Sequence, residues 1–184
     1  MSIILRAPAT ASAPELLLRQ WHDDDQDALI VAYRDPVLRS RTRFPVRTVA
    51  DARRFVDEVR EDWQAGVRFA FAVCEPDPHG GDRPVANVVL KNVAPGRPDA
   101  EVGYWTAAPA RGRGVAGRAV DAVSRWAFAH FGGLTRLDLL HQIDNLASCR
   151  VAEKAGFGFV EVLPARPPFP LDGHRHVRHA TAVG

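Results

Sequence analysis

The sequence predicts a single α/β (α+β) domain built on a mixed, mostly antiparallel central sheet with helices on both faces. The chain of 184 residues is long enough for one buried core and short for two. Its β-type segments first form a meander of three strands and then alternate with helices. Two helical segments carry a clear apolar face, so each must lie on a core. We therefore expect one domain over residues 1–184.

The first third of the chain predicts one strand and two helices. Residues 16–21 are typical of a strand, and an acidic run then favours the start of a helix over residues 23–33, because carboxylates stabilise a helix N-terminus. The second helix covers residues 48–66. It opens with a capping-box-like pair, Thr48 and Asp51, and ends at a glycine.

The remaining segments alternate between the residue periodicity of strands and that of helices. Three β-rich runs separated by turn-rich loops predict the meander, and a glycine-rich stretch then opens a long amphipathic helix. The expected elements are strands over 68–75, 84–93 and 100–105, a helix over 114–131, a strand over 136–142, a helix over 145–156, and strands over 157–163 and 174–183.

Composition excludes several function classes. The formal charge is only +2 and the charged residues are interspersed, which argues against nucleic acid or a membrane surface as the main partner. Cys74 and Cys149 lie far apart without a C-x-x-C pair, so we expect neither a disulfide nor a zinc site. The N-terminus lacks the apolar region of a secretory signal, and no segment approaches the roughly 20 apolar residues of a membrane span. A reducing, cytoplasmic location is expected.

The stretch RGRGVAG, residues 111–117, matches the dinucleotide fingerprint G-x-G-x-x-G through Gly112, Gly114 and Gly117. Such glycines let backbone N–H groups converge on a phosphate. A dinucleotide site, however, needs the fingerprint tight against its first strand in a βαβ unit. Here residues 106–111 intervene and a meander precedes them, so a nicotinamide or flavin nucleotide is the weaker interpretation.

A second pattern covers the same residues. Arg111-x-x-Gly114-x-Ala116 follows EVGYW, and the motifs Asn145-x-x-Ser148 and EKAGF lie downstream. This combination resembles the GNAT superfamily of acetyl-coenzyme A (acetyl-CoA) dependent N-acetyltransferases, and more narrowly its RimJ/RimL-type branch. The resemblance is strong over residues 101–159 and weaker towards the start. It implies a GNAT-like sheet splayed at the acetyl-CoA site and acetyl transfer to a primary amine.

The resemblance also implies which residues bind the cosubstrate. The strand before the loop would place three residues beside the acetyl group, mainly through their main chain, and the loop amides would hold the pyrophosphate. Arg118, with the loop arginines, would add positive charge for the phosphates or simply be solvated. The implied binding residues are Tyr104, Trp105, Thr106, Arg111, Gly112, Arg113, Gly114, Val115, Ala116, Gly117, Asn145 and Ser148.

Two residues are the catalytic candidates. Ser148 matches the family position whose hydroxyl approaches the coenzyme A sulfur, where it would protonate the leaving thiolate; a helix-capping hydroxyl is the alternative. Asn145 would fix the pantetheine arm or the local turn. Glu101 shares a strand face with Gly103 and Trp105 and is the first candidate for general base, directly or through a water, although an ordinary solvent-facing glutamate is the other interpretation. His141 is held in reserve as an alternative base.

Other chemistry-bearing residues receive structural interpretations. His174, His176 and His179 belong to a polar edge strand, and Cys149 is a packed residue, so no metal is expected. The favoured acceptor is the α-amino group of a protein or peptide. A small-molecule amine and a non-catalytic acyl-coenzyme A-binding module are the alternatives. Exposed sheet edges make a homodimer possible.

Overall fold

An eight-stranded mixed sheet forms the centre of the structure, a computed structural model that describes residues 3–42, 45–78 and 80–181. The strand order is β1-β2-β3-β4-β5-β6-β8-β7. Neighbouring strands are antiparallel except β5 and β6, which are parallel. The strands are β1 Leu5–Ala7, β2 Leu16–Arg19, β3 Phe69–Pro76, β4 Asp82–Lys91, β5 Asp99–Thr106, β6 Arg136–Gln142, β7 Gly158–Leu163 and β8 Gly173–His179.

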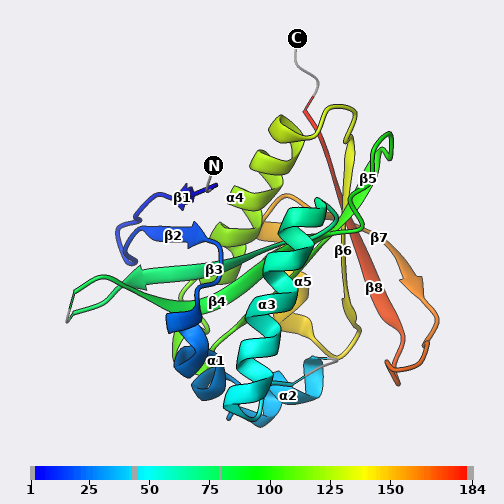
Figure 1. Cartoon of the computed structure of the whole chain (residues 1–184). Helices are drawn as coiled ribbons and strands as arrows, with labels where there is room; N and C mark the ends of the chain where they lie inside the picture. The colour runs from blue at the N-terminus through cyan, green and yellow to red at the C-terminus, as the bar shows by residue number, and fades with distance from the viewer. Residues whose placement is uncertain (1–2, 43–44, 79, 182–184) are drawn as a thin grey trace.

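Helices cover both faces of this sheet, as the sequence predicts (Figure 1). The α-helices are α1 Gln26–Ala32, α2 Pro36–Arg41, α3 Val49–Ala65, α4 Val115–His130 and α5 Leu146–Lys154, and two 3-10 turns are η1 Asp23–Asp25 and η2 Ala108–Ala110. Helix α4 links the parallel strands β5 and β6, so these three elements form a βαβ unit.

Each face of the sheet has its own apolar core. On one face α4 and α5 pack over β3, β4 and β5 through residues such as Val120, Phe71 and Val102. On the other face α1 and α3 pack through Leu29 and Val56 against alternate residues of β3. Successive side chains of a strand point to opposite faces, which explains why β3 is buried along nearly its whole length.

The structure confirms the predicted fold class and adds two short elements. Strand β1 and helix α2 are absent from the sequence prediction, although α2 has a clear start signal. Asp35 caps it by accepting hydrogen bonds from the amides of Val37 and Leu38, and Pro36 occupies the first helical position. The last strand ends at His179, before the predicted end, and residues 182–183 of that prediction lie outside the described residues.

The acidic run that precedes α1 has a structural role. Asp25 is buried and forms an ion pair of 2.7 Å with Arg19 of β2, whose guanidinium also contacts Asp82 of β4 at 2.8 Å. Asp23 pairs at 3.2 Å with Arg60 of α3. Two of the three carboxylates therefore fix the turn to its neighbours.

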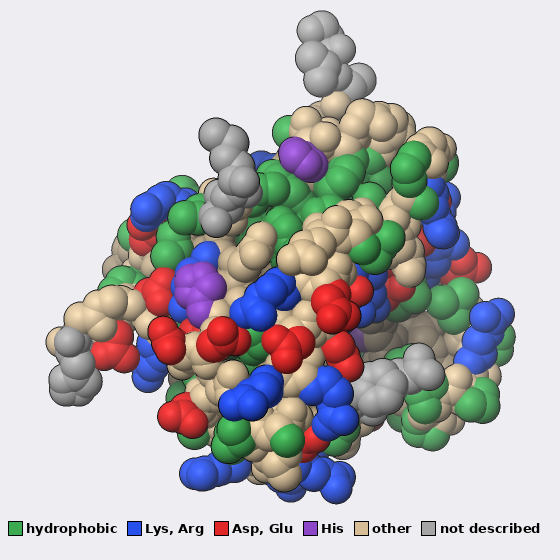
Figure 2. All heavy atoms as spheres, in the orientation of Figure 1, with side chains coloured by type: hydrophobic (Ala, Val, Ile, Leu, Met, Phe, Trp, Pro, Cys, Tyr) green, Lys and Arg blue, Asp and Glu red, His purple; other side chains and the backbone are tan. Residues whose placement is uncertain are grey.

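Acidic and basic side chains alternate on the face that carries α3 (Figure 2). This arrangement agrees with the near-neutral charge of the chain and differs from the one-sign surface of a nucleic-acid-binding protein. Within the described part of the chain, no helix combines the length and apolar composition that spanning a membrane requires.

Candidate active site

The sheet opens between its two parallel strands. Their pairing covers only three residues of each strand and ends at Glu101 opposite Asp138. Strand β5 continues to Thr106 and β6 to Gln142, but the two strands diverge beyond that point (Figure 1). The splayed sheet that the family resemblance implies is therefore present, and the opening exposes strand edges in the middle of the molecule.

Helix α4 begins beside this opening without a side-chain cap. Its N-cap residue is Gly114, in the left-handed conformation with φ 76°, and it provides no side-chain hydrogen bond. By contrast, Asp35, Thr48 and Asn145 cap α2, α3 and α5 with their side chains. Among the residues that the structure describes, no side-chain cap accepts from the first-turn amides of α4, and the helix dipole favours an anion there.

The loop before α4 depends on glycine for its shape. Gly112 has φ 75°, a conformation that residues with a Cβ rarely adopt, and a Cβ built on either Gly112 or Gly114 meets no atom within 4 Å. These glycines are thus required by the backbone and leave open space in front of the helix. Val115 is buried in the core and Gly117 faces Lys154 of α5, so both offer only backbone to a ligand.

The arginines of this region are engaged with protein groups. Arg111 forms an ion pair with Asp35, and Arg113 lies 2.8 Å from the buried carboxylate of Glu75. Arg118 Nη2 donates to three backbone carbonyls of the N-terminal segment, including that of Ala7 at 3.1 Å. Arg118 thereby fixes this segment against α4, a structural role that its sequence context did not indicate.

Tyr104 and Ser148 meet on the α4–α5 side of the sheet. The Tyr104 hydroxyl donates to Ser148 Oγ at 2.8 Å, and Ser148 is buried. The Asn145 side chain accepts a hydrogen bond of 3.3 Å from the Ser148 amide, which fixes the start of α5. Burial raises the pKa of Tyr104, although its hydrogen bond with Ser148 opposes the shift, so the phenol remains a donor at neutral pH.

This side-chain contact is absent from the sequence prediction, which gave Tyr104 mainly a main-chain role. Strand alternation places Tyr104 on the same face as Ala100 and Val102, which belong to the core beneath α4. That alternation is the signal that could have directed the phenol towards α5.

Glu101 lies on the opposite face of β5. Its carboxylate contacts Lys91 Nζ at 2.5 Å and accepts from Asn92 Nδ2 at 3.3 Å. Lys91 reaches it by passing over Gly103, where a Cβ would lie only 3.2 Å from Lys91 Cε. The structure therefore separates the two catalytic candidates, with Glu101 on the α3 side of the sheet and Ser148 on the α5 side.

The end of β5 presents one aromatic and one hydroxyl side chain. Trp105 packs between Trp21 and Tyr33, with ring centroids 6.0 and 5.6 Å away. Thr106 accepts a hydrogen bond from Arg111 through its carbonyl at 3.2 Å, and its Oγ1 is buried without a partner among the described residues. A buried hydroxyl of this kind is costly unless a ligand or water satisfies it.

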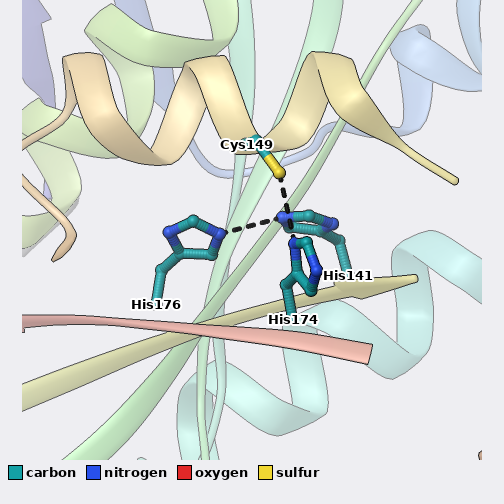
Figure 3. A group of neighbouring side chains, drawn as sticks. All are labelled: His141, Cys149, His174 and His176. Atoms are coloured by element: carbon teal, nitrogen blue, oxygen red, sulfur yellow. Dashed lines mark hydrogen bonds between the residues drawn. The ribbon is translucent and has the colours of Figure 1, made fainter. Parts of the chain in front are cut away.

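His141, the reserve base, belongs to a group that the sequence analysis did not assemble. Its ring lies with those of His174 and His176 and the thiol of Cys149, and the ligand atoms of these four residues all fall within 4.8 Å of one another (Figure 3). The sequence predicts a packed role for Cys149 and places the β8 histidines in a polar edge strand. The edge-strand prediction is wrong, because β8 lies between β6 and β7 and His176 is buried. The β6–β8 register, which pairs His141 with His174, brings the residues together.

The sheet splays after one short parallel pairing, and the splay lies beside an uncapped helix that begins with glycines. These two features indicate an enzyme of the acyl-transfer class that binds a phosphate-bearing acyl donor. The particular family follows from comparison with known proteins. Residues 15–158 match the acetyltransferase (GNAT) domain, so the chain belongs to this family. The protein is an acetyltransferase whose cosubstrate is acetyl-CoA. No curated protein gives a significant match.

Solved structures show the same fold at low sequence identity. The microcin C7 self-immunity acetyltransferase MccE, in complex with acetyl-CoA and AMP, has a TM-score of 0.79 and 17% identity, covering 93% of this chain and 98% of that chain. RimJ from Mycobacterium smegmatis, in complex with a coenzyme A disulfide, has a TM-score of 0.77 and 19% identity, with coverages of 97% and 87%. A Salmonella typhimurium acetyltransferase that modifies the N-terminal serine of a 50S ribosomal subunit protein has a TM-score of 0.78 and 16% identity, with coverages of 96% and 99%.

Proposed function

We propose that this protein transfers the acetyl group of acetyl-CoA to a primary amine by direct attack, and that the acceptor is the α-amino group of a protein or peptide. The observation that carries the proposal is the uncapped, glycine-opened N-terminus of α4 beside the gap between β5 and β6. The likeness to RimJ and to an enzyme that modifies an N-terminal serine supports the choice of acceptor.

The residues of the loop and of β5 fit acetyl-CoA. The amides of residues 111–117 would hold the pyrophosphate, because they lie at a helix N-terminus whose capping position is left open. Tyr104, Trp105 and Thr106 would lie beside the acetyl group, and the buried Thr106 hydroxyl has a hydrogen-bonding capacity that protein groups do not use. The bound cosubstrate supplies an acetyl group activated as a thioester.

Ser148 would provide the proton that the coenzyme A thiolate takes up when the carbon–sulfur bond breaks. Its oxygen already accepts a hydrogen bond from Tyr104, so its own proton is free to point elsewhere. Tyr104 would then act as a positioning residue and would return a proton to the serine oxygen, and the resulting phenolate would take up a proton from water after the products leave.

Glu101 would accept the proton that the attacking amine loses. Its two carboxylate oxygens contact Lys91 and Asn92. We therefore expect the proton to pass from the amine to Glu101 through a bridging water and not by direct contact. The demand on this base is modest for an α-amino group, whose pKa near 8 leaves roughly a tenth of it neutral at pH 7. His141 is the alternative base. It lies on the α5 side of the sheet, so replacing each residue separately distinguishes the two.

The proposal is tested by mass spectrometry on a panel of N-terminal peptides and small amines incubated with acetyl-CoA. We expect acetylated peptide α-amines, with kcat lowered about 100- to 10,000-fold in Ser148→Ala and less in Tyr104→Phe. Ser124→Ala is the matched control, because Ser124 is a buried helical serine that only donates to the Val120 carbonyl. Acetyl-CoA binding without transfer to any amine would instead favour a non-catalytic module.

The rival acceptor is a small-molecule amine, and the structurally similar MccE holds a small molecule, AMP, together with acetyl-CoA. A polyamino antibiotic would need free carboxylates around the opening. The acidic run at residues 23–25 does not provide a full set, because Asp25 is buried against Arg19 and Asp23 pairs with Arg60. Acetylation confined to small amines in the panel would replace the peptide proposal with this one.

A further inference from the structure

We propose that His141, Cys149, His174 and His176 bind one zinc ion in a tetrahedral site that fastens helix α5 to strands β6 and β8. The site includes none of Ser148, Tyr104 and Glu101, and its occupancy does not depend on the proposed acceptor. An ion bound through Nε2 of His141 would leave that ring unable to act as the alternative base. The four ligand atoms come from three elements and point towards a common centre (Figure 3).

Two of the six separations between ligand atoms lie close to the edges of a zinc tetrahedron. Typical bonds of about 2.0–2.1 Å to imidazole nitrogen and about 2.3 Å to thiolate sulfur give nitrogen–nitrogen edges of about 3.3 Å and sulfur–nitrogen edges of about 3.6 Å. His141 Nε2 lies 3.2 Å from His176 Nε2, and Cys149 Sγ lies 3.4 Å from His174 Nδ1. The longest separation in the group is 4.8 Å, so small side-chain rotations are enough to close the site.

The topology brings these residues together. In the antiparallel β6–β8 ladder His141 lies opposite His174, and His176 lies two residues further along the same face of β8. Helix α5 covers this face and directs Cys149 down onto it. A residue pattern spread over 36 positions, from 141 to 176, thus becomes a compact nitrogen and sulfur ligand set.

The hydrogen bonding of His141 prepares it as a ligand. Its Nδ1–H donates to the Gln142 carbonyl at 2.9 Å, which leaves the Nε2 lone pair directed at the cluster. Histidines that bind metals usually have such a backbone partner on the other nitrogen.

The surroundings of the site leave it partly open to solvent, and an aromatic ring forms an apolar wall on one side. His176 is 1% exposed, whereas the other three ligands are only partly buried. The ring of Phe159 in β7 packs edge-on against His174 and His176, with centroid distances of 5.0 and 5.7 Å. Imidazole and thiolate together favour zinc over the oxygen-seeking ions magnesium and calcium.

The site has a consequence for the neighbouring active-site residue. Ser148 immediately precedes Cys149 in α5, and its hydroxyl contacts Tyr104 across the same helix–sheet interface. A bond from the ion to Cys149 would therefore limit movement of the helix turn that holds Ser148. The acetyl-transfer chemistry itself does not use the metal.

The experiment is a cobalt titration of the full, chelator-treated chain under reducing conditions, followed by displacement with zinc. We expect one Co²⁺ per chain, a thiolate-to-cobalt charge-transfer band in the near ultraviolet, and visible bands of tetrahedral intensity that zinc abolishes. Cys149→Ser should lose the charge-transfer band. His176→Gln should weaken zinc binding more than about 100-fold, because even outer-shell partners of a metal site contribute about 10- to 100-fold.

Two variants serve as matched controls. Cys74 is buried in β3, where burial raises the pKa of its thiol to about 12, so Cys74→Ser should leave the spectrum unchanged. His179 lies in the same strand as two ligands but outside the cluster, so His179→Gln should also bind cobalt normally. Circular dichroism and acetyl-CoA calorimetry verify that each variant is folded.

Three outcomes would overturn the proposal. Weak, six-coordinate cobalt spectra would show that the four side chains do not form the site. An unchanged charge-transfer band in folded Cys149→Ser would place the metal elsewhere. Failure of zinc to displace cobalt from the folded, reduced chain would reject zinc as the metal that these residues bind. If Cys149→Ser does not fold, the same titration of Cys149→Ala decides the second outcome.

Discussion

Replacing Gly114 with leucine provides the sharpest test of the proposed phosphate-binding role of helix α4. Gly114 has φ 76°, and a left-handed backbone costs a residue with a Cβ about 1–2 kcal/mol. A Cβ there meets no atom within 4 Å, so no steric clash adds to this cost. For a chain of this size, that loss lowers Tm by about 2–8 °C. The protein should therefore remain folded at room temperature.

The effect on binding should be larger than the effect on stability. A leucine side chain at Gly114 projects into the space in front of the first-turn amides, and a lost hydrogen bond to a charged group costs about 1.5–3 kcal/mol. This loss corresponds to an affinity for acetyl-CoA lower by about 10- to 150-fold. Isothermal titration calorimetry with acetyl-CoA, and with NADH in parallel, measures it directly.

Gly66 provides a matched control. It ends α3 with φ 70° and also has no atom within 4 Å of a Cβ, so Gly66→Leu carries the same backbone cost away from α4. We expect both variants to lose similar Tm and only Gly114→Leu to lose acetyl-CoA affinity. Unchanged binding by Gly114→Leu would refute the assignment of the loop. Binding of NADH in place of acetyl-CoA would restore the dinucleotide interpretation.

Three further predictions concern stability. Asp25→Asn breaks a buried ion pair with Arg19 and should cost about 3–5 kcal/mol, or about 6–20 °C in Tm by thermal denaturation; a loss below about 1 kcal/mol would contradict this. Burial lowers the pKa of His141 and His176, so the unfolded metal-free chain binds more protons as pH falls below about 6.5. Urea midpoints should therefore decline over that range, and less steeply in His176→Gln. Asn145→Ala removes the cap of α5 and should cost about 0.5–2 kcal/mol in urea unfolding, whereas an unchanged midpoint would show that the 3.3 Å hydrogen bond contributes nothing.

Local patterns were sufficient to predict most elements and the glycine-rich loop that opens α4. The capping pair Thr48 and Asp51 and the helical periodicity of residues 114–131 depend on neighbours within a few positions, and the structure confirms both helices. Strand β1 has only three residues, too few to show a periodicity. Helix α2 has six, and its start signal lacks an amphipathic run to support it.

The contacts that define the candidate site could not be predicted in the same way. The hydrogen bond between Tyr104 and Ser148 joins residues 44 positions apart, and it depends on how α5 lies over the sheet. The gathering of His141, Cys149 and His174 depends on the β6–β8 register, which no residue pattern within either strand specifies. Strand alternation predicts which face a side chain occupies, but only the register and the covering helix decide what it meets.

Because β5 and β6 diverge, each of these two strands presents an edge in the middle of the sheet. Exposed edges usually invite pairing with another molecule, and proteins protect them with charges or short strands. Here the two edges lie beyond the last pair of the β5–β6 ladder, Glu101 and Asp138, and an extended chain lying between them could hydrogen-bond to their backbone groups. Strand β4 hydrogen-bonds alternate residues of β5, so only the amides of residues 102–106 that point away from β4 should exchange rapidly in the free protein. These amides should exchange slowly when such a chain occupies the opening. Protection of these amides from exchange would then indicate that a ligand is bound between the strands.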